Sequence, residues 1–381
     1  MKCIGRNASS GAVVELAGGS VLDRVEELIA PPPTSIWLAP GFIDIQVNGY
    51  AGVDYCNPDT PLDEIARSLE VQFSTGVTRL FPTVITGSPE LMLGAIRNLA
   101  RARRELPHGQ ALEGIHVEGP HISPLDGPRG AHPKRSVRPP DIEEFKRWQD
   151  AAEGHVRLVT LSPEWPEAPR YIEYLAGAGV VVAIGHLHAT PTQIDDAVRA
   201  GATLSTHLGN GAASQLPRHP NYLWQQLAED RLAASFIVDG IHLGRDFLNV
   251  ALRAKGLERA VAITDAVAPA GCQPGPYMLG EVEVTLHPGN RVTLRESDRL
   301  AGSALRMDRG VENLMRLCGL SLSDALTLAT RNPARVGRID GRRRGLQPGD
   351  RADVVEFEYD DAAQSIRVLR TWLDGELVHS A

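Results

Sequence analysis

The sequence has few cysteines and no long hydrophobic run, and each shortage excludes a class of protein. Only four cysteines occur, Cys3, Cys56, Cys272 and Cys318, and no two of them form a C-x-x-C pair. Such scattered thiols do not suit a disulfide framework, so free thiols in a reducing compartment are expected. No stretch approaches about 18 consecutive apolar residues, and no apolar segment follows the first lysine. We therefore expect a soluble cytoplasmic protein that does not bind membranes.

Clustered positive charge is also nearly absent. The formal net charge is -8, and the one basic tract, Arg342-Arg343-Arg344, is expected to form a solvated turn. Nucleic acid is therefore not an expected partner. With 381 residues, of which 43% are hydrophobic, the chain can hold two ordinary domains or one large barrel with an appendage.

The two ends of the chain are predicted to form one small β-domain. Residues 1–39 hold short segments separated by glycine and proline, and they are too few to bury a core alone. Residues 352–358 and 365–378 have the pattern of strands, with turn residues at Asp374-Gly375. We expect a small β-sandwich domain built from 1–39 and 341–381, with the rest of the chain inserted into it.

Between these ends, short apolar strands alternate eight times with segments of helical spacing. The candidate strands are 41–48, 77–85, 112–118, 156–162, 180–186, 202–208, 231–239 and 259–265. Eight consecutive βα units favour a closed parallel barrel, so residues 40–340 are predicted to form an α/β domain of the (β/α)8 TIM-barrel type. In such a barrel, the strand ends and the loops after them form the catalytic face.

Apolar spacing and capping residues predict several of the helices. Thr190-Pro191-Thr192-Gln193 combines an N-cap hydroxyl, a first-turn proline and a reciprocal glutamine, and Gly201 is expected to end that helix. Ser321 and Asp324 form a similar capping pair. Two further helices are predicted from apolar residues on one face, namely Leu62, Ile65, Leu69 and Phe73, and Val311, Leu314, Met315 and Cys318.

Three of the predicted strands end in residues that commonly bind metal ions. Glu118 stands where a Gly-Pro turn stops one strand, and His186 and His207 end two others. In a barrel these side chains would converge on the catalytic face, although the sequence separates them. One carboxylate and two imidazoles suit a divalent ion, and Zn²⁺, Fe²⁺ and Mn²⁺ all accept such ligands.

Other polar residues follow the first and the last predicted strand. Gln46 and Asn48 face the same side of their strand and are weak metal ligands, so they either orient water or substrate or satisfy backbone groups in a turn. Asp265 follows the eighth strand, where a carboxylate facing a metal site can accept a proton from water and return it to a leaving amine. The expected reaction is the attack of an activated water molecule on an amide carbonyl.

The order of these motifs resembles the N-acetylglucosamine-6-phosphate deacetylases of the amidohydrolase superfamily, over nearly the whole chain. The segments that carry the resemblance are Pro40-Gly41-Phe42-Ile43-Asp44, His116-Val117-Glu118-Gly119-Pro120, Gly185-His186, Thr206-His207-Leu208, Asp239-Gly240, Thr264-Asp265-Ala266 and Leu300-Ala301-Gly302-Ser303. The resemblance implies a metal-dependent hydrolase that removes the acetyl group from an N-acetylated amino sugar, with N-acetylglucosamine 6-phosphate as the expected substrate. The products would be the free amine and acetate.

The same resemblance implies a role for the residues at the strand ends. Asp265 matches the general base and acid of the family. Gln46 and Asn48 stand where other branches of the superfamily have paired histidines, which implies one bound metal ion, most simply Zn²⁺. The residues that match the metal ligands are Glu118, His186 and His207.

Residues that match the family's substrate contacts lie in the loops. His132 matches a histidine that meets the amide or the sugar, and Asn210 matches a residue that lines the sugar pocket. Arg218 and His242 match groups that reach the phosphate. The arginine would come from the neighbouring subunit of a homodimer.

The chain departs from the family pattern in these same loops. Asn210 is followed by Gly211-Ala212 where the family has Ala-Met. After Arg218 the family commonly has one residue and then Pro-Gly, whereas this chain has His219-Pro220-Asn221. His121 and His188 also stand at positions where the family pattern has other residues. Two alternatives therefore stay open, an amidohydrolase that acts on a different N-acyl or cyclic amide, and a non-catalytic amidohydrolase-like scaffold. The presence of all three ligands together with the general base argues against the scaffold.

Overall fold

Eight parallel strands form the central sheet of the computed structural model, which describes residues 1–342 and 344–381. Their spatial order is β14-β13-β12-β11-β10-β9-β8-β5. A bridge between Val47 and Ala266 joins the first of these strands to the segment after the last, so the barrel is nearly closed, as predicted. The strands are β5 (Phe42–Val47), β8 (Val77–Ile85), β9 (Ile115–Glu118), β10 (Val156–Leu161), β11 (Val181–Ile184), β12 (Leu204–Ser205), β13 (Ala233–Ile237) and β14 (Ala260–Ile263).

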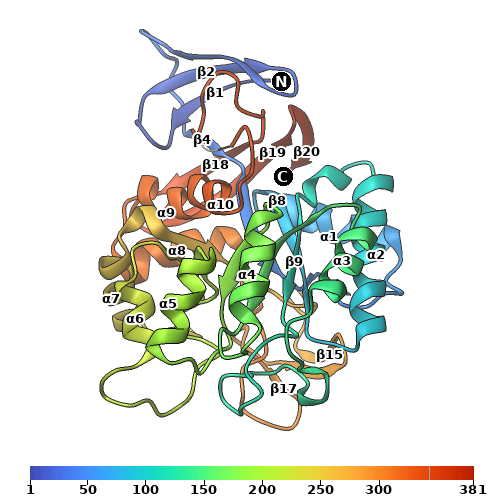
Figure 1. Ribbon diagram of the computed structural model, residues 1–381. Helices are drawn as coiled ribbons and strands as arrows, with labels where there is room; N and C mark the ends of the chain where they lie inside the picture. The colour runs from blue at the N-terminus through green and yellow to red at the C-terminus, as the bar shows by residue number, and fades with distance from the viewer. Residues whose placement is uncertain (343) are drawn as a thin grey trace.

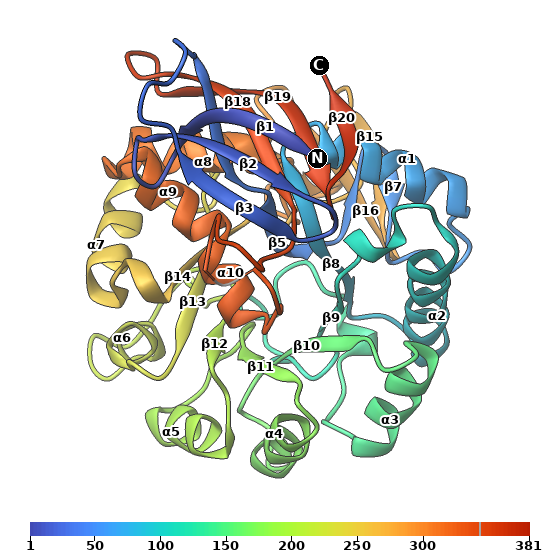
Figure 2. The same cartoon turned by 90° about the horizontal axis from the view of Figure 1, so that it is seen from above.

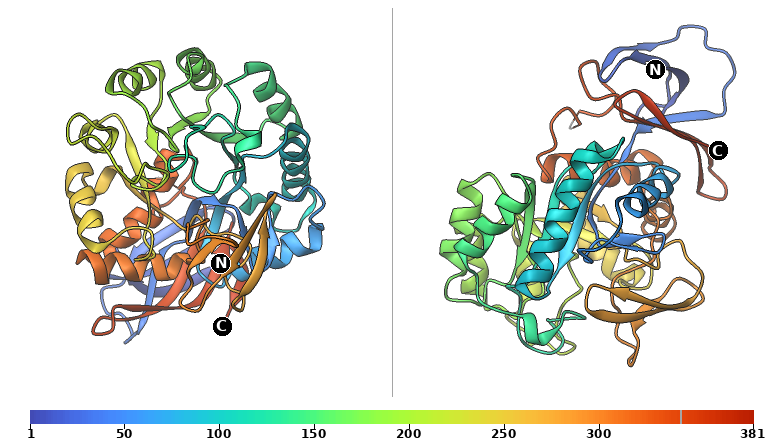
Figure 3. Two further views of the ribbon diagram at one scale, coloured as in Figure 1. Left: turned by 90° about the horizontal axis from the view of Figure 1, so that it is seen from below. Right: turned by 90° about the vertical axis from the view of Figure 1, so that its right-hand side faces the viewer.

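A helix follows each strand and packs on the outside of the barrel, as Figure 3 shows from below. The ring consists of α1 (Leu62–Phe73), α2 (Pro89–Glu105), α3 (Ile142–Ala151), α4 (Ala168–Gly177), α5 (Pro191–Ala200), α6 (Tyr222–Ala228), α7 (Arg245–Lys255) and α8 (Met307–Cys318). Two more helices, α9 (Leu322–Ala329) and α10 (Arg331–Val336), lead back towards the terminal strands (Figure 2). Eight βα units are therefore present in the predicted order.

Local sequence signals account for the bounds of several helices. Helix α1 buries Ile65, Leu69 and Phe73 on one face, as their spacing predicts. Helix α5 begins at the capping box in which Thr190 and Gln193 bond reciprocally, and it ends at Gly201, whose φ of 119° lies in the left-handed region that glycine tolerates.

The inside of the barrel is filled by branched apolar side chains that alternate along the strands. A separate cluster of buried residues forms there, and Ala334 and Ile339, from α10 and the segment after it, contribute to it. The strand residues of this cluster are Ile43, Ile45, Phe81, Leu158, Val181, Ala183, Leu204, Ile237, Val261 and Ile263. The barrel is therefore a packed core with its functional surface at the strand ends.

The chain termini form a second sheet of seven strands, in the order β20-β19-β18-β4-β1-β2-β3. These strands are β1 (Lys2–Asn7), β2 (Val13–Gly18), β3 (Leu22–Glu27), β4 (Ile36–Pro40), β18 (Val354–Asp360), β19 (Ser365–Leu373) and β20 (Glu376–Ser380). Figure 1 places the sheet at the end of the barrel opposite to β15 and β17. The predicted β-domain from both ends is confirmed as one hydrogen-bonded sheet, while its exact boundaries at residues 39 and 341 stay predictions.

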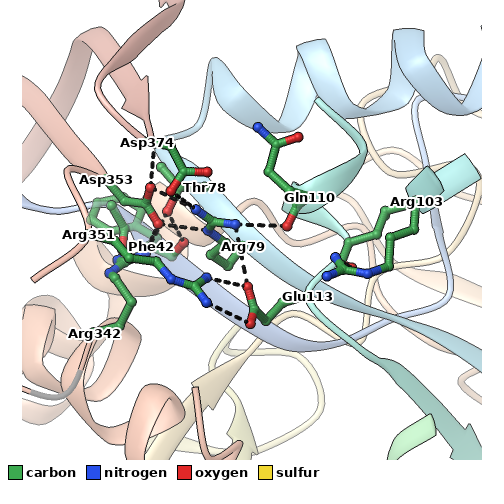
Figure 4. Close-up of polar contacts among 12 residues, drawn as sticks. Phe42, Thr78, Arg79, Arg103, Gln110, Glu113, Arg342, Arg351, Asp353 and Asp374 are labelled. Atoms are coloured by element: carbon green, nitrogen blue, oxygen red, sulfur yellow. Dashed lines mark hydrogen bonds and ion pairs between the residues drawn. The ribbon is translucent and has the colours of Figure 1, made fainter. Parts of the chain in front are cut away.

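A buried network of charges joins the barrel to this terminal sheet (Figure 4). Arg79 stands at the start of β8. Its Nε lies 2.7 Å from Asp353, and its Nη2 lies 2.6 Å from Asp374. Its Nη1 lies 3.4 Å from Glu113, which Arg351 also pairs at 2.7 Å. Arg79 and Asp353 are 2% and 1% exposed, so each depends on the other for compensation of its charge.

The expected solvated turn at Arg342-Arg343-Arg344 is wrong for its first residue. Arg342 is 2% exposed, and its guanidinium pairs with Asp353 of the network. Arg344 is exposed and bonds Asp350 at 3.0 Å, while Arg343 lies outside the described residues. Besides Asp353, which lies 11 residues further along the chain, the guanidinium bonds Thr78 and the carbonyl of Gly41, both more than 260 residues away, and these contacts hold Arg342 in the interior.

Two features of the chain between the sheets complete the fold. Three antiparallel strands, β15 (Gly275–Leu279), β16 (Val282–Leu286) and β17 (Val292–Leu294), follow β14 as two successive hairpins that were not predicted. After β5, β6 (Gly49–Tyr50) pairs with β7 (Val53–Asp54). Short 3-10 turns span Gly109–Ala111, Lys134–Ser136 and Leu257–Arg259.

All four cysteines are free, as expected. A search of the described residues finds no helix long and apolar enough to cross a membrane.

Candidate active site

Glu118, His186 and His207 meet at the ends of β9, β11 and β12. The Nε2 atoms of His186 and His207 lie 3.2 and 2.9 Å from Oε1 of Glu118, and 3.1 Å from each other. All three residues are buried, and their donor atoms lie within 4.8 Å of one another. The structure therefore brings together the three side chains that the sequence predicts as metal ligands.

The backbone at these strand ends is unusual for residues with side chains. His186, His207 and Asp265 have φ values of 49°, 31° and 49°, in the left-handed region that non-glycine residues seldom adopt. Each such residue costs on the order of 1–3 kcal/mol, and such strain gathers at functional sites. The fold therefore holds these three side chains in place at some expense of stability.

Backbone groups and glycines fix the ring of His186. Its Nδ1 donates to the carbonyl oxygen of Pro128 at 2.8 Å, so in the neutral ring Nε2 carries a lone pair. A Cβ on Gly211 would lie 2.7 Å from Nδ1, and one on Gly130 would lie 3.0 Å from Cε1. Both glycines also have positive φ, so they are required both for the loop conformation and for the space around the ring.

The donor set fits a divalent cation. Burial raises the pKa of Glu118, but the contacts with His186 and His207 outweigh burial and hold that pKa well below its ordinary value. Without a cation, protons cannot satisfy all three contacts, because a proton on each Nε2 makes the 3.1 Å contact between the two rings repulsive. A cation in the same place replaces those protons and accepts one lone pair from each residue. One carboxylate and two imidazoles also match the ligands of known divalent sites.

Asp265 lines the same cavity and receives hydrogen bonds from both amides of the first strand. Asn48 Nδ2 donates to its Oδ1 at 2.7 Å, and Gln46 Nε2 donates to the same oxygen at 3.3 Å. Burial and, after it, the charge of Glu118 raise the pKa of Asp265 to about 8, and a divalent ion held by Glu118 would favour the charged carboxylate at neutral pH. The predicted orientation of Gln46 and Asn48 to one side is observed, but in this structure they contact a carboxylate.

A second buried carboxylate holds the segment that carries Asp265. The side chain of Asp44, on β5, accepts hydrogen bonds from the hydroxyl and the backbone N–H of Thr264. The backbone N–H of Asp265 donates to the carbonyl of Gln46 at 2.9 Å. Burial raises the pKa of Asp44 to about 7. These bonds between the first and last strands explain how Asp265 keeps its strained backbone.

A cavity of about 530 Å³ opens above these groups, at the loop end of the barrel. His132 is 5% exposed there, with Nε2 3.2 Å from Nε2 of His186 and Nδ1 2.8 Å from the hydroxyl of Thr86. Burial and, after it, the neighbouring His186 lower the pKa of His132 to about 3. Asn210 also lines the cavity, so both residues that the sequence predicts as substrate contacts lie on its wall, and their role stays a prediction.

His242 lies on the wall of the same cavity and is fixed by an acid. Its Nδ1 lies 2.7 Å from Oδ2 of Asp239, whose other oxygen accepts the backbone N–H groups of Ile241 and His242 at 2.8 Å. A proton on Nδ1 leaves Nε2 of His242 as the atom available to a ligand.

The other residues named from the sequence lie outside the cavity. Arg218 is exposed in the loop before α6 and does not line the cavity of its own chain, so its role in a neighbouring subunit stays a prediction. His121 is fully buried, 5.6 Å from the ring of Trp148, and its Nδ1 lies 3.1 Å from the carbonyl of Arg138. His188 and His219 are exposed.

Several site residues were not found from the sequence. Thr86 bonds His132. Pro128 bonds His186 through its backbone carbonyl, and a sequence motif of side chains cannot predict such a contact. Arg299 lines the cavity just before the Leu300–Ser303 motif and resembles any surface arginine in sequence. Leu279, from the unpredicted hairpin, also lines the cavity. These contacts depend on how loops meet across the barrel mouth.

Comparison with known proteins gives a consistent group of relatives. The family model described as the amidohydrolase family matches residues 37–378. N-acetylglucosamine-6-phosphate deacetylase of Bacillus subtilis (strain 168) is 33% identical over 331 residues, which cover 86% of this chain and 82% of the relative. N-acetylgalactosamine-6-phosphate deacetylase of Escherichia coli O157:H7 is 33% identical over 366 residues, which cover 94% and 93%.

Solved structures agree with this grouping. N-acetyl-D-glucosamine-6-phosphate deacetylase from Mycobacterium smegmatis superposes with a TM-score of 0.89 at 31% identity, with 100% of both chains covered. A mutant of that enzyme in complex with N-acetyl-D-glucosamine-6-phosphate gives a TM-score of 0.87 at 32% identity, covering 97% of this chain and 95% of the other. The similarity therefore extends over both the barrel and the terminal sheet.

Proposed function

This chain belongs to the amidohydrolase family, and on that premise we propose that it is a metal-dependent deacetylase of an N-acetylhexosamine 6-phosphate. The proposed reaction hydrolyses the acetamido group to give the free amine and acetate. Relatives named for the glucosamine and the galactosamine substrate are both 33% identical to this chain, so the proposal covers both epimers, with N-acetylglucosamine 6-phosphate as the first to test.

One observation carries the proposal, namely the convergence of the three donor side chains beside a carboxylate that is free to move a proton. Glu118, His186 and His207 would hold one divalent ion per chain, with Zn²⁺ as the expected metal and Fe²⁺ or Mn²⁺ as alternatives. Such an ion supplies Lewis acidity, which polarises an amide carbonyl and activates water.

Asp265 is proposed as the general base and acid. Its carboxylate takes the proton of the attacking water and delivers it to the amide nitrogen as the C–N bond breaks. Asn48 and Gln46 both donate to Oδ1, which leaves Oδ2 as the oxygen that exchanges the proton.

His132 is proposed to bind the acetyl carbonyl. Its lowered pKa keeps the ring neutral near pH 7, and a neutral imidazole with Nδ1 accepting from Thr86 presents an Nε2–H donor to the cavity. A donor placed there stabilises the charge that develops on the carbonyl oxygen during attack.

The rest of the sugar phosphate would lie against the loops after β12 and β13. Asn210 and His242 line that side of the cavity, and the fixed tautomer of His242 leaves Nε2 available to the substrate. We propose a homodimer in which Arg218 of one protomer reaches the phosphate bound by its partner. The exposure of Arg218 and its place outside its own cavity support this arrangement. Four free cysteines fit a reducing, cytoplasmic location.

The proposal is tested by acetate release from N-acetylglucosamine 6-phosphate, N-acetylgalactosamine 6-phosphate and their unphosphorylated forms. We expect turnover of at least one phosphorylated sugar, loss of turnover after treatment with a chelator, and recovery on addition of a divalent metal. Equal kcat/KM for the phosphorylated and unphosphorylated sugars would remove the phosphate from the proposal. Absence of acetate from all four sugars would contradict the deacetylase itself.

Two other functions differ from this one in measurable ways. An amidohydrolase for another N-acyl or cyclic amide would bind metal but release no acetate from these sugars. A non-catalytic scaffold would bind no metal, and the buried donor set of Glu118, His186 and His207 argues against it.

A further inference from the structure

The cavity wall carries three carboxylates and one guanidinium. Glu118, Asp126 and Asp265 supply the negative charges. Arg299 is the one arginine or lysine that lines the cavity in residues 1–342 and 344–381. A divalent ion on Glu118, His186 and His207 would balance much of this charge, but a phosphate monoester adds one to two negative charges near neutral pH, which favours a second fixed cation where the phosphate lies.

Arg299 is anchored at the mouth of the cavity between two loops. It stands in the segment that follows β17, at the end of the barrel opposite to the terminal sheet (Figure 1). Its Nη1 donates to the carbonyl of Gly130 at 3.1 Å, and a Cβ on Gly130 would lie 3.0 Å from the ring of His186. The guanidinium, on an exposed side chain, therefore contacts the loop that packs against the ring of His186.

Among the described residues Arg299 forms no close ion pair, unlike the other arginines around it, although its charge contributes to the lowered pKa of Asp126. In the same hairpin region, Arg291 pairs with Asp298, and Arg295 pairs with Glu283. In the facing loop, Asp126 is already paired with Arg129. Among the described residues, no acceptor bonds Nε or Nη2 of Arg299, which leaves two donor groups for a ligand.

We propose that Arg299 is a specificity-determining residue that binds the phosphate of the substrate with its planar guanidinium. This inference rests on the proposed deacetylase and adds a phosphate contact from the same chain, besides Arg218 from a neighbour. Two parallel N–H groups match two phosphate oxygens, a geometry that a lysine cannot reproduce. Arg299 takes no part in the chemical step, so it acts on substrate affinity.

The first test compares Arg299→Gln with wild type on an N-acetylhexosamine with and without its 6-phosphate. Glutamine can still donate to the carbonyl of Gly130, so the loop anchor is kept while the charge is lost. We expect kcat/KM for the phosphorylated sugar to fall about tenfold or more, through KM, because a hydrogen bond to a charged group is lost. The value for the unphosphorylated sugar should stay within about twofold.

Two variants serve as controls. Arg299→Lys keeps the positive charge but lacks the planar guanidinium, so its kcat/KM for the phosphorylated sugar should lie between those of wild type and Arg299→Gln. Arg295→Ala removes a charge from the same segment without touching the cavity and should behave as wild type. Equal falls for both sugars in Arg299→Gln, or a fall in kcat for both, would show that Arg299 only anchors the loop and would overturn the proposal.

A binding measurement separates this inference from the proposed reaction. Inorganic phosphate is titrated calorimetrically into metal-loaded wild type, Arg299→Gln and Arg295→Ala. We expect affinity to weaken about tenfold or more in Arg299→Gln only. If that result appears while wild type releases no acetate from any sugar, the deacetylase fails and Arg299 remains an anion-binding residue. If all three proteins bind phosphate equally, the role of Arg299 is refuted whatever the turnover.

Discussion

The contact between Asn48 and Asp265 allows the role of the general base to be measured by a double-mutant cycle. Asn48 is 2% exposed, and its Nδ2 donates to Oδ1 of Asp265 at 2.7 Å. If this bond orients the carboxylate, then Asn48→Ala must act through Asp265 and lose its effect when the carboxylate is gone.

The expected size of the effect follows from the geometry. A hydrogen bond to a charged group contributes about 1.5–3 kcal/mol, which corresponds to about 10- to 150-fold in rate. At 2.7 Å the bond from Asn48 lies in this range, whereas Gln46 lies at 3.3 Å and should matter less. Asp265→Asn should itself lower kcat by at least ~10²-fold, which is the usual scale for a positioned acid-base group.

The assay is acetate release at saturating sugar phosphate by wild type, Asn48→Ala, Asp265→Asn and the double variant, each checked for metal content and melting temperature. We expect Asn48→Ala to lower kcat by about 10- to 150-fold in the wild-type background and by less than about twofold in Asp265→Asn. Equal factors in the two backgrounds would refute the argument, because Asn48 would then act on the substrate and independently of Asp265.

The remaining predictions concern the metal, the substrate and the interdomain network. Glu118→Gln should lower the metal content well below one equivalent per chain, measured by elemental analysis, because a neutral amide is a poor ligand. Arg218→Ala should lower kcat/KM for the phosphorylated sugar, and mixing it with an inactive Asp265→Asn protein should restore activity if the residue acts across a dimer. Asp353→Asn should destabilise the protein by about 3–5 kcal/mol in chemical denaturation at pH 7, because Arg79 and Arg342 then remain buried with less compensation. In wild type, the Arg342 and Arg79 charges outweigh burial and lower the pKa of Asp353 from 3.8 to about 2, so stability of about 2 kcal/mol, present above pH 4, should be lost as the pH falls towards 2.

These outcomes have clear controls. The exposed pair Glu358 and Arg367 offers a comparison for the network, since Glu358→Gln removes a carboxylate that water already solvates and should change stability little. If Asp353→Asn proved as mild as Glu358→Gln, the network would not be the connection that we describe. If mixing the Arg218→Ala and Asp265→Asn proteins gave no more activity than the Arg218→Ala protein alone, the contact across a dimer would be wrong.

Much of the fold follows from local patterns. The apolar segments that become β8, β10 and β13 have the length and the bounding residues of buried strands, and the capping box of α5 fixes its first turn. The hairpin at 275–294 was missed because its strands are short and partly exposed, with burial that differs from strand to strand. Such a pattern is weak beside the strong runs of the barrel.

The site was predicted to the extent that strand ends in a barrel converge. That rule is enough to bring Glu118, His186 and His207 together, because each directly follows or ends a parallel strand. It does not specify the positive φ of His186 and Asp265, which contacts across the barrel impose.

Contacts between residues far apart in sequence account for what was missed. Arg342 was expected in a solvated turn because its sequence neighbours are charged, yet its guanidinium bonds Thr78 and the carbonyl of Gly41, which lie more than 260 residues away. Gln46 and Asn48 were placed on the correct side of their strand, but their partner Asp265 lies more than 200 residues away. The sequence does not mark Arg299 as a site residue, because its contact is with the carbonyl of Gly130, 169 residues away.

A single divalent ion shared by Glu118, His186 and His207 is the central element of the proposed mechanism. Its most direct test is to strip the protein of metal and to follow acetate release from N-acetylglucosamine 6-phosphate while Zn²⁺ is added in fractions of one equivalent. The rate should be negligible at first, rise in proportion to the added metal and level off at one equivalent per chain. Full activity in the stripped protein, or a rate that keeps rising to two equivalents, would contradict it.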